Sequence, residues 1–248
     1  MRSNLGGMSE SVKPRTYRSS VREEQARRTR LAILDAARLL FTEQGYAATT
    51  IAQIAARAGV AVDTVYAAVG TKPVLTRLLM ETAISGSDQA VPPEERDYVR
   101  RIRAAGTASE KIRIYATAVT EVNSRLAPLH LVLRDAAAQA PELGELWTEI
   151  ATRRAQNMRL FAQDLAVTGE LRPGLDVQEV ADVVWSLNYA EYYSLLVRER
   201  GWPPARLAAW LAGTWCRLFL ASSGDETDDP CPDSEQPGQP LDSARYGL

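Results

Sequence analysis

The chain has 248 residues, a net charge of −2 and 46% apolar residues, which is enough to build a sizeable core. No run approaches the roughly 18 apolar residues of a membrane span, and the first residues lack a hydrophobic signal core. The two cysteines, Cys216 and Cys231, show no metal-ligand spacing. We therefore expect a cytoplasmic protein that has no membrane association, no metal site and no cofactor.

Charge is distributed unevenly along the chain. Residues 1–85 hold 12 Lys and Arg against 7 Asp and Glu, whereas the remainder holds 17 against 24. A basic front and an acidic back predict that the amino-terminal part meets a polyanion. Solvated charge alone gives the same division, so this pattern supports the interpretation without proving it.

The predicted elements are all helices, because Ala and Leu are frequent and aromatic residues make up only 7%. Residues 1–20 are polar and are predicted to form a disordered basic arm. A first helix follows, with an apolar stripe over residues 31–41. Gly45 is expected to be its C-cap.

Three short helices are predicted next. Thr50 and Gln53 have capping-box spacing and begin a helix that ends at Gly59. Residues 60–69 form the following helix, and residues 71–84 form a fourth, with a threonine N-cap and a proline in its first turn. Gly, Ser and Pro residues then indicate a connection between two halves of the chain.

Further helices and an acidic tail complete the all-α fold. The helices are predicted at 94–104, 107–125, 128–139, 142–167, 176–199 and 203–221. The last 27 residues hold seven acids and one Arg, which is typical of a disordered tail. The predicted organisation is a disordered basic arm (1–20), a helix-turn-helix DNA-binding domain (21–72), a helical ligand-binding and dimerisation domain (73–221) and a disordered acidic tail (222–248).

The pair of short helices around Gly59 is typical of a helix-turn-helix, which places its second helix in the major groove of DNA. Glycine permits the sharp turn, and Val60, Val65 and Val69 are expected to pack on the core. The candidate DNA contacts are then the residues at helix N-termini and on the outward face of the second helix. They are Thr49, Thr50, Gln53, Val62, Asp63, Thr64, Tyr66 and Lys72.

A longer pattern surrounds this motif and includes Thr29 to Ala37, Phe41, Gly45-Tyr46, Thr49-Thr50, Ile54-Ala55, Ala58-Gly59-Val60, Thr64-Val65-Tyr66 and Lys72 to Leu75. With these residues in this order, residues 29–75 resemble the DNA-binding domain of TetR-family transcriptional regulators. The resemblance implies a three-helix DNA-binding domain, a helical ligand-binding domain and a homodimer. It also implies that Thr64 and Tyr66 meet the DNA and that Lys72 binds a phosphate.

The chain departs from the family pattern at several positions. Ala61 stands where family members usually carry a serine, so a helix N-cap is missing, which costs about 1 kcal/mol. Val69 stands where phenylalanine is common. Asp63 either accepts a hydrogen bond from a cytosine amine or only favours the helix N-terminus. Tyr66 is interpreted as a phosphate contact, with a place in the core as the alternative.

Arginines gather ahead of the first apolar stripe, at Arg15, Arg18, Arg22, Arg27, Arg28 and Arg30. A basic arm of this kind can enter the minor groove of DNA. The alternative is a flexible, solvated run of charge, and the sequence leaves both interpretations open.

The second half of the chain carries more apolar surface than one core needs. Residues 176–199 have apolar residues on two faces, and residues 203–221 are also too apolar to stand in solvent. Pairing these helices with their copies predicts a two-fold homodimer. The candidate ligand-binding residues are Glu121, Asn123, His130, Arg134, Trp147, Met158, Phe161, Trp185, Asn188 and Tyr189. Plain core packing is the alternative for each aromatic residue in this set.

These features predict a ligand-responsive repressor that a small-molecule effector releases from a palindromic double-stranded DNA operator. A DNA-binding regulator that is controlled by a protein partner, or that acts as an activator, is the alternative. An enzyme is not expected, because one histidine supplies no metal cluster and no phosphate-binding loop or nucleophile elbow is present.

Overall fold

The structure is a computed structural model that describes residues 15–87 and 91–221, with side chains from Val21 onward. The predicted tail at 222–248 and the first 14 residues of the predicted arm lie outside the described residues. Over the described ranges the regular elements are helical, apart from an isolated bridge between Leu171 and Leu220. The all-α fold class predicted from the sequence is therefore confirmed.

The elements follow one another along the chain with short connections. They are α1 (Arg15–Ala48), α2 (Ile51–Ala58), α3 (Val62–Val69), α4 (Lys72–Ser85), η1 (Pro93–Glu95), α5 (Asp97–Ala104), α6 (Ala108–Ala137), α7 (Pro141–Ala166), α8 (Val177–Leu187), α9 (Ala190–Tyr193), the π-type turn η2 (Ser194–Glu199) and α10 (Pro204–Phe219). None of the described helices combines the length and apolar composition that crossing a membrane requires.

Helix α1 begins earlier than the sequence predicted. Residues 15–20 are helical, so this part of the predicted disordered arm is a correction. The helix continues through residues 21–30, which are rich in Arg, Glu and Gln, and these are good helix formers. Glu24 accepts hydrogen bonds from Arg27 and Arg28, both at 2.9 Å, and pairs at this spacing support a helix. Gly45 interrupts the helical geometry with φ of 81°, near the end that was predicted.

Helix α6 passes through Pro128, where the sequence predicted a boundary between two helices. A proline removes one backbone hydrogen bond and usually kinks or ends a helix. Here Ala127 and Leu129 on either side are 0% and 4% exposed, so both neighbours pack in the interior. Tertiary packing therefore outweighs the local preference, and a single helix of 30 residues results.

The predicted helix over residues 176–199 is broken in the structure. Helix α8 ends at Leu187, and Asn188 leaves helical geometry with φ of −85° and ψ of 8°. The break turns the backbone carbonyl of Asn188 toward Asn123, whose side-chain amide donates a hydrogen bond to it at 3.0 Å. A buried polar contact thus replaces the continuing helix, which periodicity alone does not reveal.

Two apolar clusters form the interior. The first joins α1–α4 to the end of α6 and the start of α7, with Phe41, Ile54, Leu75 and Leu133 among its fully buried members. The second joins α5–α8 to α9 and α10, and Trp215 is completely buried in it. Because α6 belongs to both clusters, it connects the two parts of the molecule.

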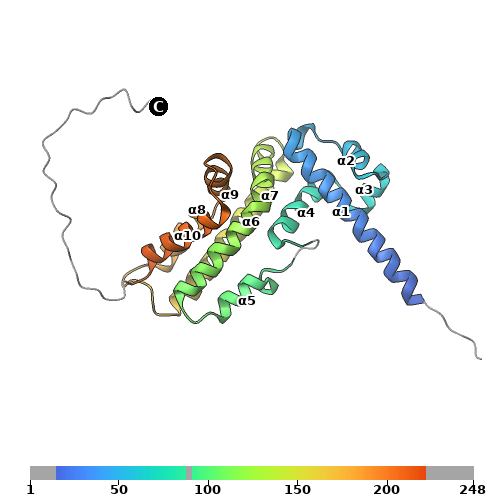
Figure 1. Ribbon diagram of the computed structural model, residues 1–248. Coiled ribbons are helices and arrows are strands. Elements are labelled where there is room, and N and C mark those ends of the chain that lie inside the picture. Colours follow the sequence, from blue (N-terminus) through green and yellow to red (C-terminus); the bar gives the residue numbers. More distant parts are fainter. Residues whose placement is uncertain (1–14, 88–90, 222–248) are drawn as a thin grey trace, which may run out of the picture.

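Figure 1 shows α6 running along the length of the molecule, with α1–α3 at one end and α5, α8 and α10 beside its other part. The amino-terminal turns of α1 project beyond the remaining helices. Helices α2 and α3 therefore lie at an extremity, where their outer faces are open to a partner.

Candidate DNA-reading face and ligand cavity

The α2–α3 turn has the geometry that the motif requires. Gly59 adopts a left-handed conformation with φ of 69°, and the amide of Val60 donates to the carbonyl of Ala55 at 3.0 Å. On the inner face of α3, Val65 and Val69 are 0% and 3% exposed. The predicted packing of these valines is confirmed, and it fixes which face of α3 points outward.

The start of α2 carries the predicted capping box. The Gln53 amide donates to Oγ1 of Thr50 at 3.2 Å, and the Thr50 amide donates to Oε1 of Gln53 at 2.8 Å. Arg57 holds the other end of α2 to α1 through an ion pair with Glu43 at 2.6 Å. The remaining amides of the first turn have no partner within the helix.

Thr49 does not occupy the position that the sequence predicted. It is 1% exposed, and its hydroxyl donates to the Gly45 carbonyl at 2.8 Å and accepts from Nε2 of Gln44 at 3.2 Å. Its side chain therefore fixes the loop before α2 and does not reach a phosphate from this conformation. The cause is the break in helical geometry at Gly45, whose carbonyl accepts the hydrogen bond from this hydroxyl.

The outward face of α3 is formed by four of the predicted residues. Val62 and Tyr66 are 39% and 50% exposed, Asp63 is exposed, and Thr64 lies half-buried beside them. Among the described residues, the hydroxyls of Thr64 and Tyr66 have no hydrogen-bond partner. Ala61 provides no side-chain cap, as expected, and Asp63 lies in the first turn of α3. The helix thus presents hydroxyl, carboxylate and methyl groups to the outside.

Lys72 flanks this face at the start of α4. Its Nζ lies 3.9 Å from the centre of the Tyr46 ring, and burial lowers the pKa of its ammonium group. Thr71 occupies the predicted N-cap position but makes no side-chain cap hydrogen bond. The lysine is therefore held against α1 and presents a positive charge beside α3.

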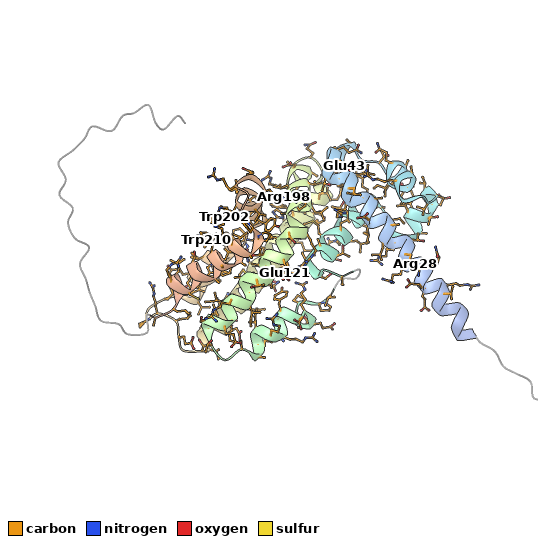
Figure 2. All side chains as sticks on the ribbon, in the orientation of Figure 1. Arg28, Glu43, Glu121, Arg198, Trp202 and Trp210 are labelled. Carbon is orange, nitrogen blue, oxygen red and sulfur yellow. The ribbon has the colours of Figure 1, made fainter. Side chains whose placement is uncertain are left out.

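Figure 2 shows Arg28 on the projecting part of α1 and Glu43 near the other end of that helix. Arg27 and Arg28 share the carboxylate of Glu24, and these hydrogen bonds hold the pKa of Glu24 at about 2. The projecting segment is consequently a charged helix in which two cations share one anion.

A second feature is a cavity of about 570 Å³ enclosed by α4–α7 and the α8–α9 corner. This volume is in the range of small-molecule sites. The residues of the predicted ligand-binding set that line it are Asn123, His130, Trp147, Met158, Phe161, Asn188 and Tyr189.

Three residues of that set do not line the cavity. Glu121 is exposed on the middle of α6 (Figure 2). Arg134 is exposed and pairs with Asp135 at 3.1 Å. Trp185 lies behind Arg154, against its guanidinium. Each is displaced because its position on the helix, not its residue type, decides which way it faces.

A buried polar cluster forms part of one wall of the cavity. The Asn188 amide donates to the Tyr115 hydroxyl at 2.6 Å, and that hydroxyl donates to the Met158 sulfur at 3.1 Å. Burial raises the pKa of Tyr115. Arg154 donates through Nε and Nη2 to Oδ1 of Asn188, at 3.1 and 2.9 Å. These contacts join α6, α7 and the corner after α8.

Sequence reasoning missed Tyr115 and Arg154. The signal for Arg154 was its helical spacing, since it lies seven residues after Trp147 and seven before Phe161, on the same face of α7. A long charged side chain is usually placed in solvent. Only the tertiary structure shows that this one turns inward.

His130 is buried against aromatic rings of the cavity wall. Its ring centre lies 4.7 Å from that of Trp147 and 4.8 Å from that of Tyr189. Its Nε2 is 3.6 Å from Oε2 of Glu191, and neither atom has a hydrogen-bond partner among the described residues. Burial, with the positive charge of Arg154 and Arg134, lowers the pKa of His130 from 6.5 to about 4.

This burial predicts a pH dependence of stability. Between pH 6.5 and 4 the unfolded chain takes up a proton at His130 while the folded chain does not, so the free energy of unfolding falls as the pH drops through that window. A His130→Gln variant lacks the only histidine of the chain and should lose this part of the fall. Urea unfolding at pH 7 and 4.5 measures the difference, and parallel curves for variant and parent would contradict the assignment.

The structure thus combines an exposed helix-turn-helix face, of the kind that places a helix in the DNA major groove, with a cavity in the remaining helices. Residues 33–73 match the family model described as "Bacterial regulatory proteins, tetR family". The match covers α2, α3 and the carboxy-terminal part of α1, so the amino-terminal region of this chain is similar to the DNA-binding region of that family.

The whole fold is shared with solved structures. The SmeT–triclosan complex is 20% identical over 83% of this chain and 99% of that one, with a TM-score of 0.62. NalD of Pseudomonas aeruginosa is 22% identical over 80% and 99%, with a TM-score of 0.60. A regulator from Saccharomonospora viridis in complex with choline is 17% identical over 77% and 97%, with a TM-score of 0.58. No curated protein matches the sequence.

Proposed function

We propose that this chain is a homodimeric repressor that binds a palindromic double-stranded DNA operator and releases it when a small molecule fills the cavity. The proposal rests on a set of side chains that belong both to the cavity wall and to the apolar cluster of the DNA-reading helices. Leu126, Trp147 and Ile150 line the cavity and also pack in the apolar cluster that contains α1–α4. A ligand in the cavity therefore touches the residues that support the DNA-reading face.

Polar contacts between helices accompany the apolar connection between the cavity and the reading face. Arg77 on α4 forms an ion pair with Glu149 on α7 at 2.7 Å, and Arg125 on α6 donates to the Ala83 carbonyl of α4 at 3.0 Å. Packed interfaces of this kind shift between discrete arrangements more readily than they deform. A ligand that displaces Trp147 or Ile150 changes the position of α4, and α4 begins directly after α3.

The DNA contacts follow from the outward face described above. We assign base or phosphate contacts to Val62, Asp63, Thr64 and Tyr66, and phosphate contacts to Thr50, Gln53 and Lys72. The division of the chain at residues 72 and 73 into reading and ligand-binding domains is part of the same proposal.

The dimer is supported by apolar surface on α9, η2 and α10. Tyr192, Leu195 and Leu218 are 37%, 49% and 44% exposed. Trp202 and Trp210 pack edge to face at 6.2 Å between ring centres, on the side away from α1–α3 (Figure 2). A two-fold pair formed there presents two copies of α3 to half-sites of one duplex.

The structural neighbours agree with this proposal. SmeT is described with triclosan and the Saccharomonospora viridis protein with choline, while NalD is named a secondary repressor. At these identities the neighbours establish the fold, and their ligands and role supply the reason to test the same behaviour here.

The test begins with selection of duplexes from a random pool by the full chain. Anisotropy of a selected, labelled duplex then reports affinity while compounds that raise the melting temperature of the protein are added. The proposal expects at least one stabilising compound that weakens duplex binding, and a transcription assay in which the chain lowers transcript yield. Compounds that bind the cavity and leave duplex affinity unchanged would contradict the release mechanism.

A further inference from the structure

The cavity wall contains a cation whose protein partners are all neutral. Arg154 donates to the side-chain oxygen of Asn188 and to the backbone carbonyl of Trp185. The rings of Trp185 and Tyr189 each lie 4.3 Å from its guanidinium carbon. Among the described residues, no carboxylate forms a salt bridge with it. The guanidinium is therefore oriented, but no salt bridge to a described residue compensates its charge.

Partial burial makes that charge unfavourable. Desolvation lowers the pKa of Arg154 to about 10, so the group is still cationic at neutral pH. A buried charge without a partner is costly, whereas a charge-assisted hydrogen bond to an anion is among the stronger polar contacts. Nη1 makes no hydrogen bond to a described residue, and this N–H edge is available to a ligand.

Two acids at or beside the cavity, Asp164 and Glu191, already pair with other cations. Asp164 accepts from the buried Lys111 at 2.8 Å. Glu191, the acid that acts on Arg154 electrostatically, pairs with Arg134 at 3.4 Å. The charged lining of the cavity as a whole is Glu94, Arg96, Arg103, Arg153, Arg154 and Asp164. Basic residues exceed acidic ones on this wall, which favours an anion over a cation.

The remainder of the wall suits an apolar body. Val119, Phe161 and Met158 face the interior, and Leu160 and Val167 line the cavity although they are 62% and 86% exposed. Exposed apolar side chains on a cavity wall mark its opening. An entering molecule thus meets apolar surface first and the guanidinium at the polar cluster.

We propose that the cavity binds an amphipathic monocarboxylate whose carboxylate accepts hydrogen bonds from Arg154 and whose aromatic or aliphatic body lies against the apolar wall. This inference rests on the proposed function, because it names the chemical class of the effector. Arg154 also joins α7 to the corner after α8, so a purely structural role is the alternative. That role predicts no preference for a charged ligand over a neutral one.

The experiment compares matched ligands by calorimetry on the full chain. The probes are 2-naphthoate against 2-naphthamide, and decanoate against decanamide, at pH 7.5. The parent protein should bind the carboxylate of a pair about tenfold or more tightly than the amide, as expected for a hydrogen bond to a charged group. Arg154→Met should remove the preference and keep the amide affinity, whereas Arg154→Lys should retain part of it.

Arg159→Met serves as the matched control, because Arg159 is exposed on the same helix and does not line the cavity. Three results would overturn the inference. The parent could bind acid and amide with equal affinity, Arg154→Met could keep the preference unchanged, or the parent could bind neither pair. If Arg154→Met does not fold, as judged by its melting curve, the parent and Arg154→Lys decide the result. The selected-duplex experiment is independent, so a failure there sinks the proposed function and leaves carboxylate binding standing.

Discussion

Replacing Thr64 and Tyr66 together by alanine should lower affinity for the selected duplex by about 100-fold, at about 1–3 kcal/mol for each lost contact. The protein should fold as the parent does, since Tyr66 is 50% exposed and neither hydroxyl bonds to another described residue. Neither side chain is charged, so the slope of log affinity against log salt should stay the same. Fluorescence anisotropy over a salt series measures both quantities.

The matched control is Thr42→Ala, which removes an exposed hydroxyl of α1 that donates to carbonyls within its own helix. Its duplex affinity should equal that of the parent. If the double variant binds the duplex within a factor of two of the parent, α3 does not contact the DNA, and the assignment of the reading face is wrong.

The Trp215→Ala variant should lose about 3–5 kcal/mol of unfolding free energy, as expected when a buried Trp is truncated. Trp215 is 0% exposed, and its ring stacks on Tyr115 at 5.7 Å between centres. The lost volume lies directly behind the polar cluster of Asn188, so carboxylate binding should weaken as well. Urea unfolding gives the free energy, and calorimetry gives the affinity.

Leu160→Ala is the comparison for that loss, because Leu160 is apolar but 62% exposed. Its unfolding free energy should change by less than about 1 kcal/mol, as for most exposed substitutions. Equal destabilisation by the two substitutions would contradict the assignment of Trp215 to the structural core of the cavity domain.

The reading face was predictable from the sequence because its signals are local. Gly59 requires a left-handed turn, Thr50 and Gln53 satisfy each other within one helical turn, and Val65 and Val69 share one face of a short helix. Each of these relations spans a few residues. The sequence therefore predicted both the motif and the direction in which α3 faces.

The cavity was predictable only in part, because its wall depends on contacts between distant residues. Asn188 breaks the predicted helix to meet Asn123 and Tyr115, which lie 65 and 73 residues earlier in the chain. Arg154 turns inward because the rings of Trp185 and Tyr189 enclose it. No periodicity within one helix contains this information.

Local signals also gave wrong predictions where tertiary packing or the end of the preceding helix decided the outcome. Pro128 predicted a helix boundary, yet the buried residues beside it keep α6 continuous. Thr49 sits at a helix start, where a hydroxyl often meets a phosphate, but the carbonyl of Gly45 takes that hydroxyl. In both cases residues outside the local motif decided the structure.

Photocrosslinking from α3 tests the central claim most directly. A benzoylphenylalanine placed at Ala67, an exposed residue of α3, is irradiated in the complex of the full chain with its selected duplex. We predict crosslinks to bases in two half-sites separated by one or more helical turns, and none from the same probe at Leu160 on α7. A complex that forms on the selected duplex without crosslinks from Ala67, or with crosslinks only from Leu160, would contradict the account.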